Sequence, residues 1–234
     1  MIKKTLQIEK KARYFLLGNP GDDTSIVWVV LHGYGMLSEF FIQKFKKLEN
    51  KNTLILAPEA LNRFYIDTNY GRVGASWMTK DERQDDIKEN IKYLNSLMDQ
   101  IIREIGHNRF KINVLGFSQG GATACRWLFK SGLKFENLIM WAGDIPKDTL
   151  TEENRLKWSD MNTHLVMGKK DELINEEMIL NADFILHGHT HRYRSELIKN
   201  TLVFNPGECA GILKDKNNIG LLDTEKKTSK IINF

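Results

Sequence analysis

Five short apolar runs along the chain alternate with segments in which apolar residues recur every three or four positions. The runs are rich in β-branched residues, which is typical of strands buried on both faces of a parallel sheet. They lie at residues 26–31, 53–57, 112–115, 138–141 and 164–167. Upstream of them, residues 4–9 and 12–17 predict two further short strands that form a hairpin around Lys10 and Lys11.

Three helical patterns lie between these strands. Ser38 is a candidate N-cap of the first, and Thr79 and Glu82 have capping-box spacing ahead of a long apolar stripe that stops near Gly106. The third helix is expected over residues 119–131. Strands that alternate with helices indicate an α/β fold, with a mostly parallel sheet flanked by helices on both faces.

Two segments do not follow this alternation. Residues 58–78 are rich in aromatic residues but show no clean period. A loop of this length is often functional, so the segment is expected to form either a binding wall or a surface connection packed by its own aromatic residues. The C-terminal part is β-rich, with short strands expected at 193–198, 201–204, 219–222 and 229–232.

The composition narrows the class of protein. With 234 residues, 41% hydrophobic and 27% charged, the chain is an ordinary globular protein and not a disordered, collagenous or disulfide-rich one. The net charge of +4 is spread along the chain, so we expect no nucleic-acid partner. No apolar run reaches the ~20 residues of an integral membrane segment, and charges at 9–13 interrupt any signal peptide. The two cysteines, Cys125 and Cys209, favour free thiols and a cytoplasmic location.

The string Gly116-Phe117-Ser118-Gln119-Gly120 has the pattern G-x-S-x-G between a predicted buried strand and a predicted helix. This strand–turn–helix context is the one that the pattern needs in order to carry chemistry. A serine on so sharp a turn requires small residues two positions away, and the following helix directs its N–H groups at developing negative charge. Ser118 is therefore a candidate nucleophile; the alternative is a tight glycine-rich turn with a capping serine.

The string His32-Gly33-Tyr34-Gly35 directly follows the first buried strand, where glycines allow the backbone to curl and present N–H groups. The backbone amides of Tyr34 and Gln119 are accordingly the candidate oxyanion donors. His32 lies within this oxyanion segment, so we expect a structural role for it rather than that of the catalytic base. Candidate walls of a substrate pocket are Leu37, Trp77 and Met78.

These residues resemble the α/β-hydrolase superfamily, and in particular its phospholipase/carboxylesterase (acyl-protein thioesterase-like) branch. The matching strings, in the family's order over residues 24–178, are Leu31 to Gly35, Ala57-Pro58, Ser76-Trp77, Gly116 to Ala122 and Gly168 to Asp171. The resemblance implies an α/β-hydrolase fold, a Ser-Asp-His triad and no metal or other cofactor. It also implies small-molecule substrates such as carboxylic esters, thioesters or lysophospholipids.

By this resemblance Asp171 is the acid of the triad, which holds the imidazole in the required tautomer. A helix N-cap at the same position is a compatible alternative, and Asp144 is the second candidate acid. The histidines depart from the family pattern, because His187, His189 and His191 follow Asp171 more closely than the family's histidine follows its acid.

The C-terminal sequence resembles a different class. Residues 181–224 contain the strings Gly-His-Thr-His and Asn-Pro-Gly, as at the C-terminal end of small calcineurin-like metallophosphoesterases. In that class the Gly-His-Thr-His turn supplies two metal-ligating imidazoles. We therefore expect residues 1–180 to be an α/β-hydrolase domain truncated at its C-terminal end, and residues 181–234 to be a metallophosphoesterase-like β-rich tail of a chimera.

The tail is not expected to hold a complete metal site, because the Asp, His and Asn ligand strings that a two-metal centre needs are missing upstream. A crossover over 172–181 followed by a parallel strand at 183–187 would instead bring His189 close to Asp171. His189 is the candidate triad base, with His191, His187 or no histidine as alternatives.

The sequence thus predicts a metal-independent serine hydrolase that cleaves small carboxylic esters through an acyl-enzyme. Ser118 attacks the ester, His189 acts as general base and Asp171 orients it. Two alternatives are a metal-dependent phosphodiesterase that uses His189 and His191, and a catalytically dead fusion.

Overall fold

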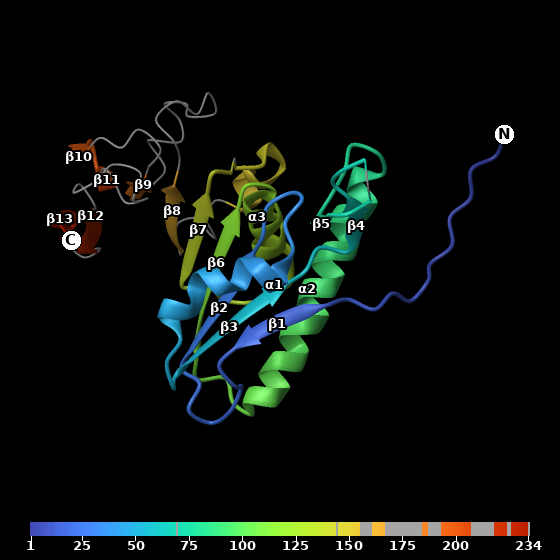
Figure 1. Ribbon diagram of the computed structural model, residues 1–234, viewed down its shortest axis with the longest axis horizontal. Helices are drawn as coiled ribbons and strands as arrows, with labels where there is room; N and C mark the ends of the chain where they lie inside the picture. The colour runs from blue at the N-terminus through green and yellow to red at the C-terminus, as the bar shows by residue number, and fades with distance from the viewer. Residues whose placement is uncertain are drawn as a thin grey trace.

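A nine-stranded sheet forms the centre of the computed structural model, which describes residues 1–68, 70–143, 145–154, 161–166, 184–186, 193–206, 218–223 and 226–233 (Figure 1). The spatial strand order is β1-β3-β2-β6-β7-β8-β9-β11-β10. All neighbouring pairs from β3 to β11 are parallel, and only β1 and β10 at the two edges pair antiparallel. The predicted mostly parallel sheet is confirmed. Its strands are β1 Tyr14–Leu17, β2 Ile26–Leu31, β3 Thr53–Pro58, β6 Lys111–Phe117, β7 Asn137–Trp141, β8 Asn162–Val166, β9 Phe184–Leu186, β10 Tyr193–Ile198 and β11 Thr201–Pro206.

Helices cover both faces of the central strands. The long helices α2 (Arg83–Ile105) and α3 (Gln119–Ser131) contribute to the larger apolar cluster, together with Val27 and Val29 of β2. The short α1 (Ser38–Phe41) and the 3-10 helix η1 (Ile42–Leu48) contribute to a second cluster with Val30. Successive side chains of a strand point to opposite faces, so β2 is apolar throughout because both of its faces are covered. Two further 3-10 turns are η2 (Lys147–Thr149) and η3 (Glu152–Asn154).

The segment 58–78 contains regular structure that its sequence did not predict. β4 (Asn62–Tyr65) and β5 (Val73–Ser76) form a separate antiparallel hairpin. In the C-terminal part the predicted strands are confirmed: β10 and β11 extend the main sheet, while β12 (Asn218–Asp223) and β13 (Thr228–Asn233) form a third, two-stranded sheet. The parallel strand expected near 183–187 is β9, which pairs with β8.

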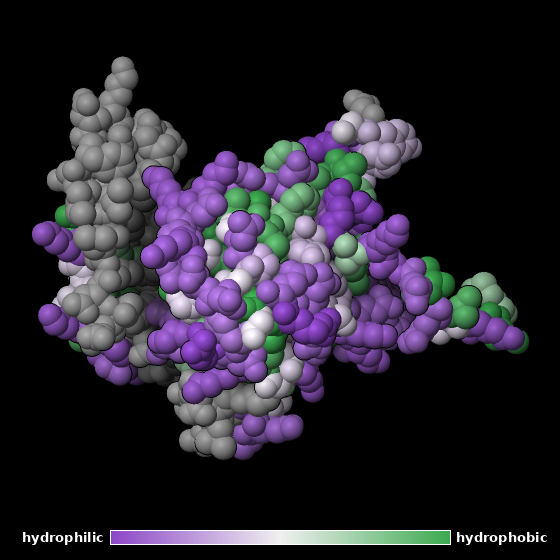
Figure 2. Space-filling view, turned by 90° about the horizontal axis from the view of Figure 1, so that it is seen from below, coloured by the Kyte–Doolittle hydropathy of each residue, from purple (hydrophilic) through white to green (hydrophobic). Residues whose placement is uncertain are grey.

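The predicted N-terminal hairpin is wrong. Residues 1–12 contain no strand and are exposed, and β1 pairs with β3 instead. Figure 2 shows this extension projecting from the body, with hydrophobic residues interspersed among hydrophilic ones. A two-residue hairpin turn requires positive φ in its central residues and so favours Asn-Gly; Lys10 and Lys11 offer no such turn chemistry.

Both predicted helix caps are also wrong. Leu37 is the N-cap of α1, and the Ser38 hydroxyl donates instead to the carbonyl of Pro58 at 2.7 Å. Glu82, with a φ of 50°, occupies the N-cap position of α2, and the Thr79 hydroxyl donates to the carbonyl of Asp81. In each case a neighbouring backbone carbonyl competes successfully for the hydroxyl. Across the described residues, no helix combines the length and apolar content needed to cross a bilayer.

Candidate active site

Ser118 alone forms the turn between β6 and α3. Its backbone has φ 52° and ψ −118°, a conformation that costs a non-glycine residue about 1–3 kcal/mol and is concentrated at functional sites. The Ser118 N–H donates to the carbonyl of Trp141 at 2.7 Å, and the N–H of Gly121 donates to the Ser118 carbonyl at 2.9 Å. Two neighbouring elements therefore hold the strained turn, which lies at the carboxyl end of a central strand.

The glycines of the G-x-S-x-G string are required by close backbone contacts. A Cβ on Gly116 would lie 2.5 Å from the nitrogen of Gly121, and a Cβ on Gly120 would lie 2.3 Å from the carbonyl oxygen of Leu31. Both distances are far below van der Waals contact. The prediction that residues two positions from Ser118 must be small is confirmed, and the second contact fixes α3 directly against the end of β2.

The loop after β2 is held by the β4–β5 hairpin. The Gly35 N–H donates to the carbonyl of Ala75 at 2.9 Å, and the Ala75 N–H donates back to Met36 at 3.2 Å. A Cβ on Gly74 would lie 2.5 Å from the carbonyl oxygen of Gly35, so only glycine permits this approach. The hairpin thereby fixes the loop that carries Tyr34, whose side chain is 61% exposed.

The proposed nucleophile and the two proposed oxyanion donors have no hydrogen-bond partner in the described part of the chain. Among the described residues, the backbone N–H groups of Tyr34 and Gln119 donate no hydrogen bond. The Ser118 hydroxyl likewise has no hydrogen-bond partner there, and the residue is half-buried. A hydroxyl and two free amides on adjoining segments are the groups that acyl transfer needs.

His32 has a structural role, as expected. It is fully buried; its Nε2 accepts a hydrogen bond from the Ala60 N–H at 3.0 Å, and its Nδ1 lies 2.8 Å from the Gly33 carbonyl oxygen. Because an imidazole nitrogen that accepts from an amide carries no proton, Nδ1 is the protonated nitrogen and donates to Gly33. Burial lowers the pKa of His32. The ring is therefore neutral with both nitrogens occupied, and it cannot also accept a proton from Ser118.

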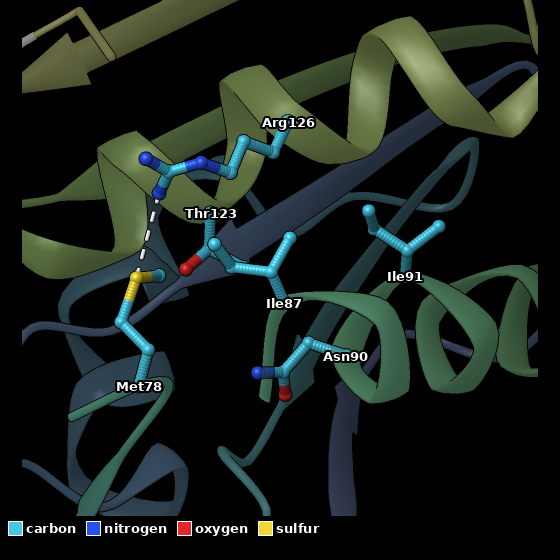
Figure 3. A pocket seen from close by; sticks show the side chains of 6 residues that line it. All are labelled: Met78, Ile87, Asn90, Ile91, Thr123 and Arg126. Carbon is cyan, nitrogen blue, oxygen red and sulfur yellow. Dashed lines mark hydrogen bonds between the residues drawn. The ribbon is translucent and has the colours of Figure 1, made fainter. Parts of the chain in front are cut away.

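The three residues expected to line a substrate pocket lie mainly in the interior. Trp77 is 0% exposed, and its Nε1–H donates to the carbonyl of His32 at 2.8 Å. Met78 is 6% exposed, and its sulfur lies between α2 and α3 at 3.4 Å from Nη1 of Arg126 (Figure 3). Such burial leaves an acyl chain almost no surface to contact on Trp77 or Met78. Leu37, which is half-buried, keeps some accessible surface.

The sequence indicated the aromatic segment 58–78 as a possible binding wall, but it did not indicate the exposed side chains of Tyr34 and Trp141. Tyr34 stacks on Phe64 of β4 with ring centroids 5.0 Å apart. Trp141, the last residue of β7 and the hydrogen-bond partner of Ser118, is 50% exposed. The sequence could have indicated Trp141, because this residue ends the predicted strand that follows the serine-bearing strand along the chain.

A half-exposed ion pair links α3 to the 3-10 turn η2. Arg126 of α3 is 7% exposed and donates from Nε and Nη2 to the two carboxylate oxygens of Asp148, each at 2.8 Å. These hydrogen bonds lower the pKa of Asp148. The pair anchors the turn η2 to the helix that begins at the nucleophile.

The remaining sequence-derived candidates lie outside the described residues. These are the acids Asp171 and Asp144, the histidines His187, His189 and His191, and the thiol Cys209. Within the described part of the chain, no group of three or more His, Cys, Asp or Glu residues could hold a metal ion. Cys125 is buried, and its thiol donates to the sulfur of Met140 at 3.0 Å.

The sequence profile of the phospholipase/carboxylesterase family matches residues 13–199. The chain belongs to this family. Its fold is similar to that of acyl-protein thioesterase 2 from Zea mays, with a TM-score of 0.53 at 19% identity, covering 70% of this chain and 79% of that one. A phospholipase/carboxylesterase from Dyadobacter fermentans gives a TM-score of 0.53 at 17% identity, over 88% and 93% of the two chains. A Bacillus cereus carboxylesterase gives 0.54 at 14% identity, over 75% and 83%.

A second similarity, in sequence, is to a protein whose name indicates a different enzyme class. A phosphodiesterase from Methanocaldococcus jannaschii is 33% identical over 91 residues, which correspond to 37% of this chain and 54% of that protein. The chain thus spans about half the length of the curated relative that it matches. The family match continues past residue 181 to residue 199, and β9, β10 and β11 belong to the same sheet as the hydrolase strands.

Proposed function

We propose that this member of the family is a metal-independent serine hydrolase that cleaves small carboxylic esters. The observation that carries the proposal is the turn at Ser118. It is strained, tightly held by glycine contacts, and flanked by the unpaired amides of Tyr34 and Gln119. A capping serine in an ordinary turn would need neither the strained backbone nor the free amides.

In the proposed reaction the Ser118 Oγ attacks the ester carbonyl carbon while a histidine takes its proton. The negative charge that develops on the carbonyl oxygen is stabilised by the amides of Tyr34 and Gln119. The histidine then protonates the leaving alcohol, and water hydrolyses the acyl-enzyme to regenerate Ser118. We assign the general base to His189 and its orienting carboxylate to Asp171.

The exposed aromatic groups suggest where substrate lies. Tyr34 lies in the oxyanion loop after β2 and stacks on Phe64, while Trp141 is the last residue of β7. The strands β2 and β7 lie on either side of β6, the strand that ends just before Ser118. These side chains, with Leu37, offer apolar contact surface beside the reacting carbonyl. We propose this surface, rather than Trp77 and Met78, as the binding wall for a short acyl or alcohol group.

A cytoplasmic location remains the expectation from the two cysteines.

A fluorophosphonate probe tests the nucleophile directly. The wild-type protein should be labelled and should hydrolyse an aryl ester, and the Ser118→Ala variant should do neither. Activity should persist in a metal chelator. Equal labelling of both proteins would show that another residue reacts and would remove the basis of the proposal.

The similarity to a phosphodiesterase favours one alternative, a metal-dependent phosphodiesterase that uses His189 and His191. It predicts Mn²⁺-dependent hydrolysis of an aryl phosphodiester that is lost in chelator and in His189→Ala but retained in Ser118→Ala. The two proposals therefore give opposite results for the serine variant and for the chelator.

A further inference from the structure

The side chain of Gln119 bridges two segments that are distant in sequence. Its Oε1 accepts a hydrogen bond from the Trp77 N–H at 2.9 Å, and its Nε2 donates to the carbonyl of Met78 at 2.7 Å. The hydroxyl of Ser76 lies 3.3 Å from the same amide group. The first residue of α3 is thereby bonded through its side chain to the backbone at the end of β5.

The bridge continues to the oxyanion loop. The indole Nε1–H of Trp77 donates to the carbonyl of His32 at 2.8 Å, two residues before Tyr34. The His32 ring is itself fixed by the N–H of Ala60, and its centroid lies 5.2 Å from that of Trp77. Gln119 and Tyr34, the two residues whose amides face the developing charge in the proposed function, are thus connected through a single buried tryptophan.

We infer that the Gln119 side chain is a positioning residue that, through Trp77 and His32, sets the position of its own amide relative to that of Tyr34. This inference rests on the proposed function. Oxyanion stabilisation depends on donors that lie close to 3 Å from where the charge develops, so a small displacement of one segment against the other weakens it. Substrate binding before the charge develops is less sensitive.

The chemistry of the bridge explains why the residue carries a carboxamide. One end must accept from an N–H and the other must donate to a carbonyl. A carboxylate has no donor, and a methionine of similar length has no donor and only a weakly accepting sulfur. Gln119→Met therefore removes both bonds while it keeps the length of the side chain.

Asn90 offers a matched control. It is a buried amide on α2 that donates to the carbonyls of Trp77 and Asp86. Among the described residues it therefore holds the same backbone segment without a hydrogen bond to α3 or to the oxyanion loop. Asn90→Leu removes a buried amide bond to Trp77 and leaves the bridge from Gln119 to His32 in place. It should lower Tm by an amount similar to that of Gln119→Met.

The experiment measures kcat and KM for an aryl ester, the rate of fluorophosphonate labelling of Ser118, and Tm, in full-length protein. We expect Gln119→Met to lower kcat and the labelling rate about tenfold or more, with KM changed less than about threefold. Asn90→Leu should keep kcat within about threefold of wild type. Equal losses of kcat in the two variants, or a loss confined to KM, would overturn the inference.

A second variant keeps the test decisive if Gln119→Met folds poorly. Trp77→Phe retains an aromatic ring but removes the Nε1–H that donates to His32, and we expect it to lower kcat as well. The double variant should lose less than the product of the two single losses, because both break one bridge; independent losses would contradict the inference. Wild-type protein without Ser118-dependent turnover would instead refute the proposed function itself.

Discussion

The central strands and the outer C-terminal strands of the same sheet are built differently. All six residues of β3 are buried, whereas none of the six residues of β10 is. The central strands are parallel and have helices on both faces, while β10 is an antiparallel edge strand. The nucleophile and the proposed oxyanion donors adjoin the first kind of strand, and the proposed acid and base come from sequence between β8 and β10.

This difference determines which catalytic groups each region can supply. A strained backbone persists only where surrounding structure determines it completely, and Ser118 is fixed by Trp141, Gly121 and the contact of Gly120 with β2. Side-chain groups such as a carboxylate and an imidazole do not require a strained backbone. A shortened or substituted C-terminal sequence is therefore compatible with catalysis if it delivers one imidazole to Ser118.

The largest expected effect tests whether the sequence between β8 and β10 supplies the imidazole that acts as the catalytic base. His189→Ala should reduce kcat for an aryl ester by roughly 10⁴-fold or more, because removing the base of a serine triad disables the nucleophile. Steady-state ester hydrolysis of purified protein measures it. The stability of the central sheet should be unchanged, which thermal unfolding checks.

The matched control is His191→Ala, two residues along the same sequence. It should retain kcat within a few-fold of wild type. If His191→Ala is the inactive variant and His189→Ala is active, the base is assigned to the wrong imidazole. Full activity in both would mean that the proton acceptor comes from elsewhere in the chain.

The next effect concerns the central region. Gly120→Ala places a methyl group against the backbone carbonyl of Leu31, which cannot move without displacing β2. Overpacking of this kind typically costs about 3 kcal/mol at its upper range, and the serine turn should be displaced with it. Urea unfolding should show the loss of stability, and ester hydrolysis should be abolished in the fraction that remains folded.

Gly132→Ala is the corresponding control at the other end of α3. Gly132 has a positive φ of 71° but no atom within 4 Å of an added Cβ, so only the backbone conformation is penalised, by about 1 kcal/mol. Activity should be retained. Equal destabilisation by the two variants would indicate that the contact with Leu31 is unimportant.

The sequence was most informative where local pattern alone decides the structure. Continuous apolar runs identified the central strands, and the G-x-S-x-G string in its strand–turn–helix context identified the turn at Ser118. Both signals reside within a few neighbouring residues. The glycine requirement could be inferred as well, because the crowding follows from the sharpness of the turn itself.

Features that depend on distant partners could not be read in this way. The β4–β5 hairpin depends on contacts of Gly74 and Ala75 with the loop after β2. Trp77 was expected to face substrate but is buried, since the carbonyl of His32 satisfies its indole N–H. Aromatic residues with a polar group serve in interiors and at binding sites alike, so their type alone does not distinguish the two.

The smallest effect concerns pH and stability within the central region. Burial lowers the pKa of His32 in the folded protein, whereas the unfolded chain should titrate near 6.5. As the pH falls below about 6.5, the unfolded state binds a proton that the folded state does not, so stability falls until the lowered pKa is reached. A single group contributes at most about 1.4 kcal/mol per pH unit to this slope.

His32→Gln isolates that contribution. Glutamine has an amide oxygen that can accept from the Ala60 N–H in place of Nε2, and it does not titrate. Urea unfolding at pH 7.5 and pH 5.5 should show that wild type loses more stability than the variant over this interval, although the variant is less stable at pH 7.5. Identical losses would mean that His32 is protonated as readily in the folded protein as in the unfolded chain, and the assignment of a neutral ring between Ala60 and Gly33 would then be wrong.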